Sequence, residues 1–198
     1  IAKSIGEADD VVTLITIHKS KGLEFPVVFV AGMDRTFNNA DFRSRYMFDE
    51  TFGIAVNTVN TELNFMTKSL PILYISDKKR AKMKAEEMRI LYVAMTRAKE
   101  RLILVGSVKK WEETKEEWDR FASIGVHDVL PSYERAKANS YLSWVGPALA
   151  SHPEFAFVRR GYNSEPVEVN EWTVHVIPNT EFKQRVMESE DETSTMSE

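Results

Sequence analysis

The stretch VVTLITIHKSKGLEFPVVFVAG, residues 11–32, decides the fold class. Residues 11–17 are apolar and β-branched, which predicts a largely buried strand. Residues 26–31, Pro-Val-Val-Phe-Val-Ala, predict a second buried strand that ends at Gly32. The polar residues between them predict a loop or a short helical turn. Two buried strands so close in sequence favour an α/β fold with a parallel sheet.

The following segments extend this pattern to residue 105. Residues 46–48 and 53–56 predict a small hairpin around Asp49-Glu50, and the Asn/Thr-rich residues 57–64 predict a loop. Residues 71–98 contain many Lys, Arg, Ala, Met and Glu, which predicts a long helix with one apolar face. Residues 101–105 predict another buried strand. A helix that leads directly into a strand is typical of an α/β unit.

The remainder of the chain has a different character. Residues 111–121 predict an acidic amphipathic helix, and residues 133–150 predict another helix that is broken near Gly146-Pro147. Short strands are predicted at 155–158 and 172–177, and the acidic, Ser/Thr-rich end predicts a disordered tail or linker. We therefore expect three regions, at 1–108, 109–187 and 188–198.

Composition excludes several classes of protein. The 198 residues contain no Cys, which excludes disulfides and thiolate sites and fits a reducing cytoplasm. No apolar run is long enough to cross a membrane, and the chain begins Ile-Ala-Lys, which predicts the interior of a longer protein. The net charge of −4 combines +5 over residues 1–110 with −9 over residues 111–198. The basic front part is suited to a polyanion.

The loop at residues 16–24 is the first candidate site. It offers the Thr16 hydroxyl, the His18 imidazole, the Lys19 and Lys21 ammonium groups, and the Glu24 carboxylate. Backbone N–H groups near Gly22 together with the lysines could hold phosphates. The alternative is a solvated basic turn.

Arg97 is the second candidate. It follows the predicted long helix and precedes a buried strand, so it can be held at the edge of the sheet. A fixed guanidinium there can stabilise charge that develops on a transferring phosphate. The alternative for a Thr-Arg pair at a helix end is a surface salt bridge.

Taken together, these segments resemble a known family. The strings IHKSKGLEFPVVFVAG (17–32) and LYVAMTRAKERL (91–102) are similar to motifs V and VI of the superfamily 1 DNA helicases of the UvrD/RecB type. The string LPSYERAKANSYLSWVGPAL (130–149) resembles the linker that follows the motor in the AddA (RexA) branch of bacterial helicase–nucleases. The resemblance implies that residues 1–108 form the C-terminal part of a RecA-like helicase domain 2A.

The resemblance also implies roles for single residues. Arg97 matches the arginine that contacts the γ-phosphate of ATP, Glu24 matches a glutamate near the ribose and phosphates, and Gly22 supports that turn. Thr16 and His18 match positions that face single-stranded DNA. Lys19 replaces the usual small residue and could add a phosphate contact. Tyr92 matches an aromatic that we interpret as core packing, and Glu87 and Arg89 are expected to pair or to order the helix.

Parts of an ATP site are missing from the sequence. No Gly is followed by Lys, so there is no phosphate loop, and Asp49-Glu50 reads as a hairpin turn pair rather than a Walker B motif. ATP and Mg²⁺ would therefore be bound mainly by other parts of a full protein, and the fragment alone should be inactive. His127, His152 and His175 lack metal-ligand spacing, so no metal site is expected.

The implied parent is an ATP-dependent helicase with an exonuclease, which translocates on single-stranded DNA in double-strand break repair and homologous recombination. Its partners would be single- and double-stranded DNA and, in a heterodimer, an AddB (RexB)-type protein, with no membrane. Two alternatives stay open. One is a UvrD-like helicase that works as a single polypeptide without nuclease, and the other is a non-catalytic DNA-binding module with a degenerate motor domain.

Overall fold

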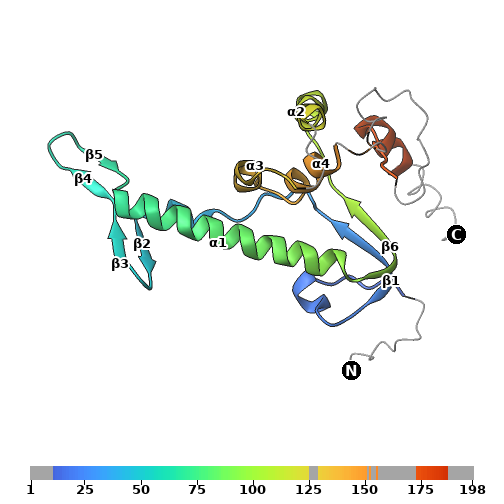
Figure 1. Cartoon of the computed structure of the whole chain (residues 1–198), viewed down its shortest axis with the longest axis horizontal. Coiled ribbons are helices and arrows are strands. Elements are labelled where there is room, and N and C mark those ends of the chain that lie inside the picture. Colours follow the sequence, from blue (N-terminus) through green and yellow to red (C-terminus); the bar gives the residue numbers. More distant parts are fainter. Residues whose placement is uncertain (1–10, 125–128, 151, 153–154, 156–172, 187–198) are drawn as a thin grey trace, which may run out of the picture. The chain divides into compact units, whose positions relative to one another are not determined.

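Strands β1 (Phe25–Ala31) and β6 (Ala98–Val105) form a parallel pair in the computed structural model of the chain. The structure describes residues 11–124, 129–150, 152, 155 and 173–186. The register runs from Phe25 opposite Ala98 to Ala31 opposite Val105. Parallel strands need a long crossover, and here it includes helix α1 (Leu70–Met95), which ends just before β6 (Figure 1). The predicted α/β class with a parallel sheet is confirmed.

The chain divides into two compact units. Unit 1 comprises Ile1–Ser107 and Ser132–Leu142, and unit 2 comprises Val108–Pro131 and Ser143–Glu198. Residues 132–142 therefore return to unit 1 after an excursion, which a division at a single point in the sequence does not describe.

Helix α1 forms where the sequence predicts it. The Ser69 side chain accepts a hydrogen bond from the Ile72 N–H at 3.4 Å, and Pro71 occupies the first turn, where its missing N–H costs little. The helix ends after Met95, where the Thr96 N–H donates to the carbonyl of Tyr92 at 3.0 Å. Both ends are thus set by local hydrogen bonds.

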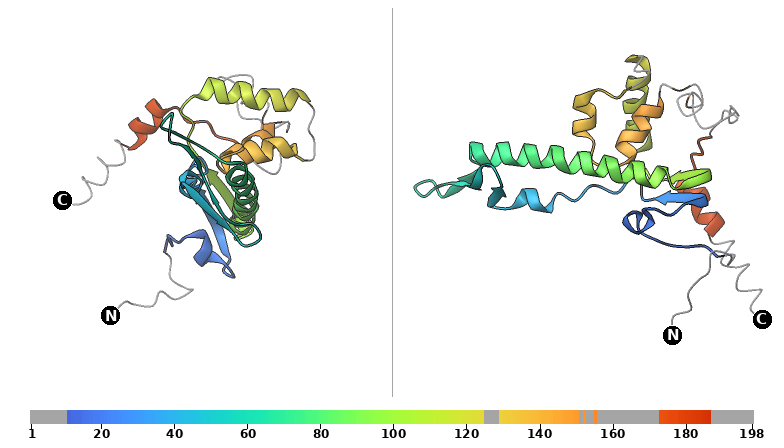
Figure 2. Two further views of the ribbon diagram at one scale, coloured as in Figure 1. Left: turned by 90° about the vertical axis from the view of Figure 1, so that its left-hand side faces the viewer. Right: turned by 60° about the horizontal axis from the view of Figure 1, so that its bottom comes forward.

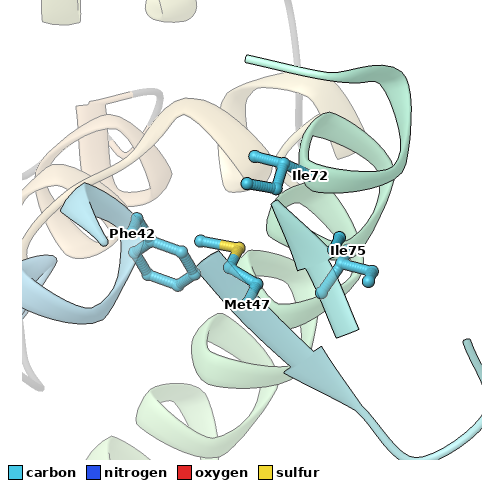
Figure 3. Close-up of a cluster of buried hydrophobic side chains, with 5 residues drawn as sticks. Phe42, Met47, Ile72 and Ile75 are labelled. Atoms are coloured by element: carbon cyan, nitrogen blue, oxygen red, sulfur yellow. The ribbon is translucent and has the colours of Figure 1, made fainter. Parts of the chain in front are cut away.

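Two hairpins lie at the amino-terminal end of α1 (Figures 1 and 2). Strands β2 (Tyr46–Asp49) and β3 (Gly53–Val56) form the predicted hairpin. One face of it packs with short helix η2 (Ala40–Arg43) and α1 into a buried cluster, shown in Figure 3, of Phe42, Met47, Ala55, Ile72 and Ile75. The Asp49 carboxylate accepts from the N–H groups of Thr51 and Phe52, which confirms the turn.

The second hairpin corrects a prediction. Residues 57–64 were expected to be a loop, but strands β4 (Thr58–Asn60) and β5 (Phe65–Thr67) pair there in antiparallel register. The polar tip explains why this works. The Asn60 side chain accepts from the Leu63 N–H at 2.9 Å, and Asn64 adopts a left-handed φ of 49°, which asparagine tolerates better than most residues.

The predicted strand at 11–17 is wrong. Residues 11–16 have no regular structure, and the side chains of Val12 and Leu14 are fully exposed. A strand needs a neighbour to pair its backbone groups, and within the described residues β1 pairs with β6 alone. The apolar pattern therefore has nothing on which to fold in this part of the chain.

Unit 2 contains helix α2 (Trp111–Ile124), most of helix α4 (Leu142–Ala150) and a helix at residues 179–186. The buried Trp118 ring makes edge contacts with Trp111 and Phe155, at centroid distances of 6.0 and 5.6 Å. A Cβ at Gly146 would lie 2.3 Å from the Trp118 ring, so only glycine fits there. The tryptophans serve as core, as expected for most of them.

Two further predictions need correction. The helix expected at 133–150 breaks at residues 138–141, between α3 (Ser132–Lys137) and α4, and Pro147 lies inside α4. The break occurs because backbone groups of Asn139 and Leu142 bond to other segments of unit 1. Residues 173–177 are not a strand, and of the strand expected at 155–158 all but Phe155 lies outside the described residues, as does the tail.

Candidate functional site

A tight polar turn precedes β1. Helix η1 (Ile17–Ser20) begins after Thr16, whose carbonyl accepts from the N–H groups of Lys19 at 3.0 Å and Ser20 at 3.2 Å. The buried Ser20 hydroxyl donates to a carbonyl three residues earlier at 2.7 Å. The turn is therefore held by its own backbone. The side chains of Thr16, His18 and Lys19 are exposed at its start.

Gly22 lies at the centre of this turn with a left-handed φ of 85°. A Cβ at this position would meet nothing within 4 Å, so space does not demand glycine. The demand is conformational, because left-handed backbone costs most other residues free energy. Gly22 thus sets the path of the chain into Glu24.

The Arg97 guanidinium caps the carboxyl end of α1. Its Nε donates to the carbonyl of Val93 at 2.9 Å, and its Nη2 donates to the Thr96 hydroxyl at 3.2 Å. That hydroxyl donates in turn to the carbonyl of Tyr92 at 2.9 Å. A cation at this end also complements the partial negative charge of the helix carboxyl terminus.

The structure brings Arg97 and the glycine turn together. Arg97 Nη1 donates to the carbonyl of Leu23 at 2.9 Å, and the Phe25 N–H donates to the carbonyl of Arg97 at 2.9 Å. Arg97 therefore lies beside Gly22 and Glu24, although about 70 residues separate them in sequence. A guanidinium has five N–H donors, and the three hydrogen bonds described leave donors that can reach a ligand oxygen.

Glu24 is exposed and forms an ion pair with Lys99, with 3.5 Å between Oε2 and Nζ. The sequence patterns did not single out Lys99. The available signal was its place two residues after Arg97, on a strand predicted to join the same sheet as the strand after Glu24. Because the pair is exposed, its contribution to stability is small, and Glu24 can exchange Lys99 for another partner.

The opposite edge of the strand pair is closed. Asp34, after β1, accepts hydrogen bonds from the N–H of Ser107 at 3.0 Å and from its hydroxyl at 2.8 Å. These bonds hold the pKa of Asp34 below its usual value. Ligands of open α/β sheets usually lie at this carboxyl edge. Arg97 and Glu24 lie instead at the amino edge, which suits groups presented outward to another domain.

Two interpretations of side chains on α1 are wrong. Tyr92 was expected to pack in the core, but 69% of it is exposed, since the face of α1 that carries it has no cover within the described residues. Glu87 was expected to pair with Arg89 or to order the helix. Arg89 instead pairs with Glu86 at 2.9 Å, because residues three apart share a helix face, and Glu87 accepts from Tyr141.

The described residues offer neither a metal cluster nor a membrane span. No three His, Asp or Glu side chains there lie close enough to hold a metal ion. In the same residues, no helix combines the length and apolar character needed to cross a membrane.

Comparison with known proteins gives consistent matches. The family model of the UvrD-like helicase C-terminal domain matches residues 2–109. A protein of Lysinibacillus sphaericus, named as the A subunit of an ATP-dependent helicase/nuclease, is 51% identical over 96% of this chain and 15% of its own length. A protein of the same name from Anoxybacillus flavithermus is 41% identical over 92% of the chain and 15% of its length. The chain thus spans about 15% of the length of these relatives.

Proposed function

Because the chain belongs to the family of UvrD-like helicase C-terminal domains, we propose that it is the second-motor-domain part of an ATP-dependent DNA helicase/nuclease of the AddA type. In this proposal residues 1–108 form the C-terminal part of domain 2A, residues 109–187 form a linker region and residues 188–198 form an acidic tail. The single observation that carries the proposal is the hydrogen bond from Arg97 to the backbone of the Gly22–Glu24 turn.

Arg97 is the residue that acts on the γ-phosphate of ATP. The helix carboxyl end and the Leu23 carbonyl hold its guanidinium in place before any nucleotide arrives, so little ordering is needed when charge develops. Arginines in this role contribute about 10³–10⁵ to the rate of phosphoryl transfer. Glu24 lies on the same turn and would contact the ribose or phosphates, after exchanging its exposed ion pair with Lys99.

Thr16, His18 and Lys19 form the DNA side of the same turn. Their side chains are exposed, and a single backbone-bonded helical turn connects them to the glycine turn beside Arg97. A small shift at the nucleotide would therefore move the DNA contacts, which is the coupling that translocation along one strand requires.

The rest of the machine belongs to other parts of the parent. A phosphate loop and the acidic residues that hold Mg²⁺ would come from elsewhere in the polypeptide, so the isolated chain should not hydrolyse ATP. The name of the relatives suggests a nuclease in the same polypeptide and a second polypeptide of the AddB (RexB) type. The proposed role is repair of double-strand breaks by homologous recombination in the cytoplasm.

The test is Arg97→Ala in the full-length parent protein. We expect the kcat of ATP hydrolysis stimulated by single-stranded DNA to fall about 10³-fold or more, because transition-state charge loses its partner. Affinity for single-stranded DNA, measured by fluorescence anisotropy at constant salt, should stay unchanged, since Thr16, His18 and Lys19 remain. Arg89→Ala is the matched control, because that exposed arginine on α1 pairs only locally with Glu86.

Turnover near wild type in the Arg97→Ala protein would contradict the assigned role. Binding of DNA by the parent that responds to salt but not to nucleotide would favour the non-catalytic module instead.

A further inference from the structure

Residues 132–142, here called the return segment, bring the chain back to unit 1 after α2. The N–H of Phe37 donates to the carbonyl of Asn139 at 2.7 Å, and the N–H of Leu142 donates to the carbonyl of Met33 at 2.7 Å. The rings of Phe37 and Tyr141 meet edge to face with 5.3 Å between centroids. The segment is thereby fastened to the loop that follows β1.

The return segment also holds α1. The Tyr141 hydroxyl donates to Glu87 Oε2 at 2.5 Å, and the Lys84 ammonium donates to the carbonyl of Ala136. Burial first, and the Glu87 carboxylate second, raise the pKa of Tyr141 well above its usual value. The hydroxyl therefore stays protonated and able to donate at every pH at which the protein would work.

Glu87 and Arg97 are joined by a continuous helix. Glu87 lies about 12 Å along the axis from Met95, the last residue of α1. The Arg97 guanidinium is bonded to the carbonyl of Val93 and, through Thr96, to the carbonyl of Tyr92. A hydrogen-bonded helix moves as a unit over this length, so a shift at Glu87 reaches Arg97.

We propose that Tyr141 is a positioning residue for ATP hydrolysis, which sets the orientation of α1 through Glu87 and so the placement of the Arg97 guanidinium. This inference rests on the proposed function of Arg97. It gives the return segment a task beyond connection. The chain that continues into unit 2 starts immediately after the contacts that orient the arginine.

The experiment uses the full-length parent protein with Tyr141→Phe, which keeps the ring beside Phe37 and removes only the hydroxyl. We expect kcat for DNA-stimulated ATP hydrolysis to fall about five- to tenfold, the order of effect of one lost hydrogen bond. KM for ATP and the affinity for single-stranded DNA should stay unchanged, because Tyr141 lies on neither binding surface. Tyr133→Phe is the matched control, since Tyr133 lies on α3 and is 62% exposed.

Variants of Glu87 supply an independent test of the same contact. Glu87→Gln keeps an oxygen acceptor and should stay within about twofold of wild type. Glu87→Ala should lose as much kcat as Tyr141→Phe, and the double variant should lose no more than either alone. These variants keep the proposal testable if Tyr141→Phe fails to fold.

The decisive readout is the combination with Arg97→Ala. A residue that acts through Arg97 causes no further loss once Arg97 is gone, so Tyr141→Phe should leave the residual rate of Arg97→Ala unchanged. A multiplied loss would overturn the positioning role, as would a wild-type kcat in Tyr141→Phe with lowered thermal stability. If Arg97→Ala itself keeps wild-type turnover, the proposed function fails, which is a separate result.

Discussion

The two ends of α1 are built on different physical principles. At its carboxyl end, Arg97 and the turn before β1 are held by directional hydrogen bonds to backbone carbonyls. At its amino end, about 39 Å away along the axis, the β2–β3 hairpin is held by a buried apolar cluster around Ile72 and Ile75 (Figure 3). Hydrogen bonds fix atoms to within fractions of an ångström, whereas hydrophobic burial is non-directional and stabilises without such precision.

The amino end also exposes much apolar surface. The outer face of β2–β3 and the neighbouring elements carry exposed large side chains, namely Tyr46, Phe48, Phe52, Ile54, Val56, Val59, Leu63, Phe65, Met66, Leu70, Leu73 and Tyr74. The carboxyl end exposes mainly charged and polar groups around Glu24, Lys19 and Lys99. The comparison teaches that one end is suited to ions and the other is a stable support. Changes at one should leave the other intact.

The largest expected effect on this separation comes from Ile75→Ala, which creates a cavity in the apolar cluster. The opening free energy of β2–β3 amides in the full-length protein should fall by about 2–5 kcal/mol. Native-state hydrogen exchange measures it, and kcat for ATP should stay within about twofold if the ends are independent. Leu73→Ala is the control, because 44% of Leu73 is exposed. A drop in kcat equal to that of Tyr141→Phe would show the ends to be coupled.

A smaller effect is expected from Gly22→Ala at the other end. Forcing alanine into left-handed backbone costs about 1–2 kcal/mol, which should raise KM for ATP about tenfold by disturbing Glu24. Gly53→Ala is a matched control, because Gly53 has a φ of 71° and equally open surroundings in the β2–β3 turn. It should weaken hairpin protection and leave KM unchanged. An equal rise in KM from both variants would break the comparison.

The smallest effect is a dependence on pH at the hairpin end. Hydrogen bonds from the Thr51 N–H and from Lys78 hold the pKa of Asp49 below its usual value. The ionised form is thus favoured by folding, so its contribution is complete above pH of about 4 and is lost as pH falls through the lower folded pKa. Hydrogen exchange of β2–β3 amides should show protection that declines only below pH of about 4.

Asp49→Asn should abolish that decline and lower protection at neutral pH. Glu50→Gln, at the exposed neighbour in the same turn, should retain the wild-type decline. Identical profiles for the two variants would show that Asp49 does not govern the turn.

Local patterns predicted most of the elements correctly. The β2–β3 hairpin, α1 and the strands near 26–31 and 101–105 follow from turn residues, helix formers and β-branched runs, which act over a few residues. The juxtaposition of Arg97 and Glu24 was predicted from the order and spacing of two motifs. The β4–β5 hairpin was missed because Asn/Thr-rich composition does not distinguish a loop from a polar-tipped hairpin.

By itself, then, the sequence determined the family, the parallel α/β core and the place of Arg97 after a helix, because these depend on near neighbours along the chain. Only the tertiary structure decided that residues 11–16 stay unpaired, that Tyr92 faces outward and that Glu87 receives Tyr141 instead of Arg89. Each of these outcomes depends on which distant segment is present to supply a backbone partner, a cover or a donor. Spacing along the chain carries no record of that.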